Sequence, residues 1–132
     1  LYDIKMLFAD LMLLVATFLP IVAVSFAKAK KGYNNHQPRR SMDQLPDNSM
    51  AKRMLWAQAN SWEALMMFAP AVLLATLLNV SPSILNLLTG AFIAIRLVYL
   101  WCYAKDLATA RSLVWFAGVF CVIGLYVASA LA

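Results

Sequence analysis

The stretch Ala110 to Ala132, ARSLVWFAGVFCVIGLYVASALA, carries one charged residue, Arg111, near its start and is otherwise uncharged and mostly apolar. It is longer than the roughly 20 residues that a helix needs to cross the hydrocarbon core of a bilayer. In lipid the backbone must satisfy its own hydrogen bonds, so a segment of this kind is helical. The stretch therefore predicts a transmembrane helix over residues 110–132.

Three further segments are long and apolar enough, or nearly so, to cross a bilayer as helices. They cover residues 4–27, 49–78 and 82–104. The second begins before its apolar part, because Asn48 or Ser49 can cap a helix there. The sequence thus predicts an all-α membrane protein: one transmembrane four-helix domain over residues 1–132, with a polar loop at 28–48.

The composition agrees with this class. The 132 residues are 64% hydrophobic and 13% charged, whereas a soluble domain is nearer half apolar and a quarter charged. A chain this short cannot bury so much apolar surface in its own core, so lipid must cover part of it. The net charge of +5 lies mostly in loops between apolar segments, which indicates anionic lipid headgroups rather than nucleic acid as its counterpart. Cys102 and Cys121 lie inside apolar segments without metal-ligand spacing and are predicted to be buried free thiols.

The distribution of charge predicts how the helices are oriented. Between residues 28 and 53 there are seven cations and two anions, and Lys105 and Arg111 fall on the same side of the bundle. Because cytoplasmic loops carry an excess of Lys and Arg, loops 28–48 and 105–109 are predicted to be cytoplasmic and the two termini to face the opposite side.

Three ionisable residues lie where a membrane helix is expected: Asp10, Glu63 and Arg96. A charge is costly at each of these positions. Asp10 is explained by pairing with Lys5 or by reaching the interface, so it is left out of the site. Glu63 shares one face of its helix, about 80° wide, with Asn60 and Arg53. This polar face runs from the cytoplasmic end of the helix toward the middle of the membrane.

A second polar face is predicted on the third helix. Tyr99 and Tyr103 follow Arg96 at spacings that place all three on the same side, and Arg111 begins the fourth helix at the same level, next to Ser112. Two interpretations are open. Glu63 and Arg96 can pair and lock the bundle, as polar residues do between membrane helices. Alternatively, the two faces line a cytoplasmic pocket for an anionic or zwitterionic ligand.

These residues also carry a family resemblance. The segment from Arg53 to Glu63, RMLWAQANSWE, resembles the second-helix signature of the MAPEG family (membrane-associated proteins in eicosanoid and glutathione metabolism). Arg96 followed by Tyr103, and the Ala-x-x-Arg-Ser segment at 108–112, match two further motifs. The loop from Gly32 to Arg39 resembles bacterial members, which predicts a bacterial inner membrane. Together these motifs cover nearly the whole chain.

The resemblance implies a homotrimer of four-helix bundles, with glutathione as a co-substrate bound between subunits near the cytoplasmic face. It implies a hydrophobic small molecule as the second substrate. Arg111 is then expected to stabilise the glutathione thiolate, with Ser112 as an assisting hydroxyl, since the thiolate is the nucleophile. The other residues that it places at the glutathione are Gln58, Asn60, Glu63, Arg96, Tyr99 and Tyr103. No metal site is expected.

The sequence departs from the family pattern at two positions. Trp56 stands where members commonly have an Arg that anchors a glutathione carboxylate, and Ala64 stands where an aromatic residue is frequent. The cations that are candidates to replace the missing Arg are Arg39, Arg40, Lys52 and Arg53.

Three functions therefore remain open. The first is a glutathione-dependent transferase or peroxidase acting on hydrophobic electrophiles or lipid hydroperoxides. The second is a non-catalytic membrane protein, or an accessory subunit of a larger membrane complex, that retains the fold; it predicts that Glu63 and Arg96 pair directly. The third is a transporter or channel, which is disfavoured because no charged path crosses the membrane.

Overall fold

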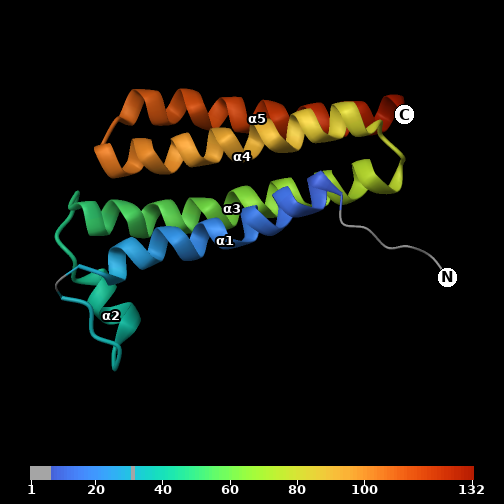
Figure 1. Ribbon diagram of the computed structural model, residues 1–132. Coiled ribbons are helices and arrows are strands. Elements are labelled where there is room, and N and C mark those ends of the chain that lie inside the picture. Colours follow the sequence, from blue (N-terminus) through green and yellow to red (C-terminus); the bar gives the residue numbers. More distant parts are fainter. Residues whose placement is uncertain (1–6, 31) are drawn as a thin grey trace.

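A computed structural model describes residues 7–30 and 32–132, and Figure 1 shows four long helices that run antiparallel to their neighbours along the chain. These are α1 (Phe8–Lys28), α3 (Met50–Leu77), α4 (Pro82–Lys105) and α5 (Ala108–Leu131). Each is long and apolar enough to cross a membrane. The predicted class, an all-α membrane protein with four spanning helices, is confirmed. Residues 4–6 of the first predicted helix lie outside the described residues.

The helix ends follow local capping chemistry. Ser49 precedes α3, and its side chain accepts a hydrogen bond from the Lys52 amide at 3.2 Å. The α4 helix ends at Lys105 because Asp106 takes up a left-handed conformation with φ 58°. This tight turn starts α5 at Ala108, two residues before the predicted start at 110.

The region predicted as a polar loop contains a short helix, α2 (Pro38–Asp43). Pro38 occupies a first-turn position, where its missing N–H costs nothing. Met42 and Leu45 are buried and anchor this segment. Lys52 of α3 donates to the carbonyls of Met42 and Asp43, at 3.3 and 3.0 Å. Six residues are too few for apolar periodicity to reveal such a helix.

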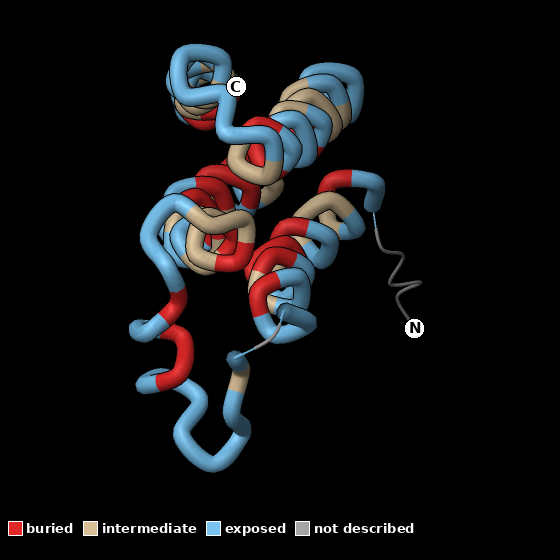
Figure 2. The backbone as a smooth tube through the Cα atoms, turned by 90° about the vertical axis from the view of Figure 1, so that its left-hand side faces the viewer, coloured by how far each residue is buried: buried red, intermediate tan, exposed pale blue. Residues whose placement is uncertain are grey.

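Two pairs of helices make up the bundle: α1 packs along α3, and α4 packs along α5. Buried alanines recur at the same spacing on α1 and α3, and small residues of this kind let membrane helices approach closely. They are Ala9, Ala16, Ala23 and Ala27 on α1, and Ala57, Ala64, Ala71 and Ala75 on α3. Viewed from the end that holds α2, the buried residues face the centre of the bundle (Figure 2).

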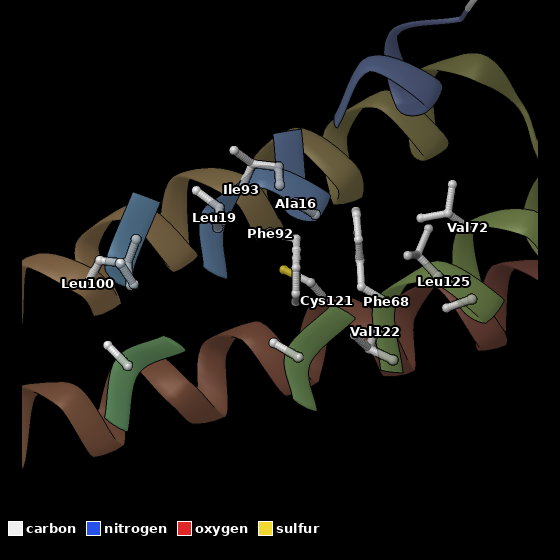
Figure 3. Close-up of a cluster of buried hydrophobic side chains, with 14 of the residues drawn as sticks. Ala16, Leu19, Phe68, Val72, Phe92, Ile93, Leu100, Cys121, Val122 and Leu125 are labelled. Carbon is white, nitrogen blue, oxygen red and sulfur yellow. The ribbon is translucent and has the colours of Figure 1, made fainter. Parts of the chain in front are cut away.

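The core is centred on Phe68 of α3 and Phe92 of α4, whose rings stack with centroids 4.0 Å apart and planes 5° apart (Figure 3). Cys121 and Leu125 of α5 complete this layer. Cys102 and Cys121 are both buried and free, as predicted. Large apolar side chains such as Phe120 (67% exposed) cover the outer faces, which suits contact with lipid.

Candidate functional site

Five of the eight predicted site residues line one cleft of about 270 Å³ between α3, α4 and α5. They are Asn60, Tyr99, Tyr103, Arg111 and Ser112. The cleft lies toward the end of the bundle that holds α2, the start of α3 and the α4–α5 turn, here called the α2 end (Figure 1). The sequence analysis therefore grouped residues that are as far as 52 positions apart in the chain, and the fold places them at one cleft.

Local helix geometry explains this convergence. Tyr99 and Tyr103 are four residues apart near the end of α4, so their side chains lie one above the other on one face. The turn at Asp106 reverses the chain within a few residues and places Arg111 on the first turns of α5, beside Tyr103. Trp115 lies one turn further along α5 and, with its neighbour Phe116, supplies the apolar part of the lining.

Two cations and two phenols contact one another in a row at the cleft: Arg96, Tyr99, Tyr103 and Arg111. The Arg96 guanidinium carbon lies 4.1 Å from the Tyr99 ring centroid, and that of Arg111 lies 4.4 Å from the Tyr103 ring centroid. Between them, the Tyr99 and Tyr103 rings meet edge to face with centroids 5.3 Å apart. Cation–π contacts of this kind hold a guanidinium in place while leaving its N–H donors for other partners. Arg111 thus packs against an aromatic ring at the cleft rather than against a carboxylate.

Arg96 is 3% exposed, and its Nη2 atom has no hydrogen-bond partner within residues 7–30 and 32–132. A second buried polar atom, Asn60 Oδ1, also lacks a partner. Buried polar groups are nearly always hydrogen-bonded, and an unpaired buried charge is costly. Among the described residues, one buried donor and one buried acceptor near the cleft therefore lack a protein partner.

The pairing of Glu63 with Arg96, one of the two interpretations of the sequence, is not the arrangement found within residues 7–30 and 32–132. Glu63 Oε2 accepts a hydrogen bond from Asn60 Nδ2 at 3.4 Å, on the same helix. Glu63 is exposed, and so is Trp56, two turns earlier on the same face of α3 (41% exposed). A carboxylate facing outward on a membrane-length helix is costly in lipid.

Gln58 lies in a different cavity. It lines a space of about 440 Å³ between α1, α2 and α3, together with Lys28, Arg39 and Asp43. Gln58 and Asn60 are two residues apart, and therefore about 200° apart around the helix axis. One ligand cannot contact both of them within a single chain, although the sequence analysis grouped them.

The cations proposed to replace the Arg at the Trp56 position differ in what they contact. Lys52 is held by carbonyls of α2, and Arg53 by carbonyls at the ends of other segments. Arg39 lines the cavity that contains Gln58. Arg40 is exposed on α2. Of these four, Arg39 alone lines a cavity that also holds a predicted site residue.

Asp10 makes a capping contact, which the sequence analysis did not predict. Its Oδ2 atom accepts a hydrogen bond from the Leu7 amide at 2.8 Å and caps the N-terminus of α1. Lys5, its suggested partner, lies outside the described residues. Within the part of the chain that the structure describes, no cluster of three His, Cys, Asp or Glu side chains forms a metal site.

The family model that matches this chain is the MAPEG family, over residues 6–131. The chain belongs to the MAPEG family. Neither a curated protein nor a solved structure matched it. In this MAPEG protein Trp56 lies on the outer face of α3 and is not among the residues that line the cleft.

Two lining residues of this MAPEG cleft, Trp115 and Phe116, were not predicted as site residues. A Trp near the end of a membrane helix usually belongs to an interfacial aromatic belt, so the residue type alone does not indicate a site. The available signal was spacing, and it applies to Trp115 alone: it follows Arg111 by four residues and so shares its side of α5, whereas Phe116, five residues on, lies about 140° around the helix.

Proposed function

We propose that this MAPEG protein is a glutathione-dependent transferase or peroxidase that acts on hydrophobic electrophiles or lipid hydroperoxides. The observation that carries the proposal is Arg111, held against the Tyr103 ring at a cleft that also presents the Ser112 hydroxyl. A cation and a hydroxyl beside a thiol lower its pKa, and the thiolate is the reactive form.

The unpaired polar atoms support a peptide-like, zwitterionic ligand. Glutathione has carboxylates that can accept from Arg96 Nη2, and N–H groups that can donate to Asn60 Oδ1. The Tyr99 ring packs against Arg96, and Tyr99 and Tyr103 line the same cleft as Asn60. Glutathione is therefore the proposed co-substrate, with Asn60, Glu63, Arg96, Tyr99 and Tyr103 as its contacts from one subunit.

A homotrimer is proposed because the cleft is incomplete in one chain. Its volume of about 270 Å³ is at or below the lower end of the range for small-molecule sites. Gln58, Lys28 and Arg39 lie on the other side of α3 and require a neighbouring subunit if they are to reach the same ligand. The outward-facing Glu63 likewise favours coverage by protein instead of lipid. Native mass spectrometry is expected to show three copies, and a monomer in native lipid would contradict this part.

In the proposed reaction Arg111 and Ser112 are the cleft residues that act on the sulfur. The glutathione thiol loses its proton to solvent, and Arg111 stabilises the resulting thiolate. With an aryl halide, the sulfur forms a bond to the ring carbon and halide leaves. With a lipid hydroperoxide, the thiolate attacks the terminal oxygen and the lipid alcohol leaves; a second glutathione then gives the disulfide and water.

The orientation of the protein is part of the proposal. The α2 end carries the cations of loop 28–48 and of the first turn of α3, so the positive-inside rule places it in the cytoplasm. Cytosolic glutathione can then enter at the α2 end, while apolar substrates arrive from the lipid.

The direct test is conjugation of glutathione to a generic aryl halide, together with reduction of a lipid hydroperoxide, by the purified protein in nanodiscs. Wild type should exceed the uncatalysed rate, and Arg111→Met should lose about 100-fold, as expected for a group that stabilises developing charge. Arg40→Met, which removes an exposed cation of α2 away from the cleft, should leave the rate unchanged. A wild-type rate equal to the uncatalysed rate for both substrates overturns the proposal.

The second candidate function is a non-catalytic subunit of a membrane complex, motivated by Trp56 and Ala64. It predicts direct pairing of Glu63 with Arg96. The described structure favours the first candidate on this point, because Arg96 packs on Tyr99 and Glu63 bonds to Asn60.

A further inference from the structure

Arg53 lies on the polar face that the sequence predicts for α3, but its side chain turns toward the end of α4. Its Nε donates to the Tyr103 carbonyl at 2.8 Å, and its Nη2 donates to the Ala104 carbonyl at 3.0 Å. Its Nη1 donates to the carbonyl of Asn48, just before α3. All three nitrogens of the guanidinium therefore bind backbone oxygens, and Arg53 holds three chain segments together.

The two α4 carbonyls are among the last four of that helix, which lack partners within the helix. The negative end of the helix dipole also favours a cation there. A second contact supports the same junction: Asn48 Nδ2 donates to Asp106 Oδ2 at 3.2 Å. We call Arg53, Asn48 and their acceptors at 103, 104 and 106 the Arg53 junction.

The Arg53 junction reaches the cleft through Tyr103. Arg53 holds the backbone of Tyr103, and the ring of Tyr103 packs against Arg111. On the other side, Arg53 precedes Asn60 by seven residues, which is two helical turns or about 10 Å along α3. The same side chain thus fixes the α3 wall of the cleft relative to the α4–α5 wall at the α2 end.

We infer that Arg53 is a positioning residue for the thiolate site: it touches no substrate, but sets where Arg111 and Tyr103 stand relative to Asn60. The inference rests on the proposed function, because it concerns the geometry of the proposed glutathione site. The planar guanidinium of Arg53 directs its N–H groups to three carbonyls in a fixed geometry, which a lysine ammonium does not have.

The first measurement does not depend on glutathione. Hydrogen–deuterium exchange of the full chain in nanodiscs reports on the turn amides of Asp106 and Leu107, which bond to the carbonyls of Tyr103 and Cys102 at 3.2 and 2.9 Å. Arg53→Met should speed exchange there by about tenfold or more, because the turn loses its support from α3. The matched control Arg40→Met should leave exchange unchanged. Unchanged exchange in Arg53→Met overturns the inference even if the enzyme is active.

The second measurement separates positioning from folding. Arg53→Met should lower kcat for conjugation by about tenfold or more while KM for glutathione changes less, since small misplacements of reacting groups are costly. The ultraviolet thiolate band of bound glutathione should titrate at higher pH in Arg53→Met, and Arg53→Lys should recover part of the loss. If exchange rises but the thiolate titration stays at its wild-type position, Arg53 is only structural and the inference fails. If wild type shows no thiolate band, the proposed function fails, and the exchange data alone decide whether the Arg53 junction holds the turn.

Discussion

Replacing Arg111 with Met removes the charge beside the proposed thiolate and keeps an apolar stem of similar length. A sphere with the cleft's volume of about 270 Å³ is roughly 8 Å across, so a sulfur in the cleft lies within about 8 Å of the Arg111 guanidinium. At that distance two unit charges interact by about 2 kcal/mol at an effective dielectric constant near 20. At contact, near 4 Å, the same estimate is about 4 kcal/mol. The cation lowers the pKa of the thiol, so its removal should raise that pKa by about 1.5 to 3.

The assay is a pH titration of the ultraviolet thiolate absorbance of glutathione bound to wild type and to Arg111→Met in nanodiscs. Saturating glutathione keeps differences in affinity out of the comparison. Arg111→Lys retains the charge and should keep most of the lowered thiol pKa, although it loses the planar contact with Tyr103. Arg40→Met is the control for the overall charge of the α2 end.

The reasoning is refuted if the thiol of bound glutathione titrates at the same pH in wild type and Arg111→Met. That result would mean that the charge of Arg111 does not reach the sulfur. The cation responsible would then lie elsewhere, and the cavity between α1, α2 and α3 that contains Lys28 and Arg39 would be the next place to look.

Substitutions at three further residues test separate contacts of the bundle. Tyr103→Phe keeps the ring against Arg111 and should retain the conjugation rate within about threefold. Tyr103→Leu removes the ring and should lose about tenfold. Equal rates for the two variants would contradict a role for the ring. Phe68→Ala should lower the free energy of unfolding in detergent by about 3 kcal/mol, because it opens a cavity at a fully buried aromatic stack, and an effect below that of Phe68→Leu would contradict this packing. Arg96→Met should raise the stability of the ligand-free protein by about 1 to 3 kcal/mol, since it removes a buried charge with an unpaired nitrogen, and should reduce the stabilisation by added glutathione. Lower ligand-free stability of Arg96→Met would show that the charge has a partner in the membrane.

The four spanning helices were predictable because hydrocarbon imposes a length and a composition on any segment that crosses it. The short helix α2 was not, because six residues give no periodic signal and its anchors, Met42 and Leu45, depend on tertiary packing. The early start of α5 depends on the left-handed turn at Asp106, which sequence patterns do not specify.

The candidate site was predictable in its composition but not in its grouping. Helical spacing correctly placed Tyr99 and Tyr103 together, and both line the cleft with Arg111. The separation of Gln58 from Asn60 follows from the same helical geometry. The motif alone does not indicate it, because residues that are neighbours in a motif can lie on opposite sides of a helix. The use of Arg53 could not be read from the sequence, because its acceptors are carbonyls about 50 residues away that any side chain would present.

The most direct test of the account is an electron cryo-microscopy map of the protein in nanodiscs with saturating glutathione. The account predicts tripeptide density in the cleft between α3, α4 and α5, with its sulfur beside Arg111 and Ser112 and with Gln58 of a neighbouring subunit at its far side. An empty cleft at saturating glutathione, or an assembly in which Glu63 faces lipid and no second subunit reaches the cleft, would contradict it.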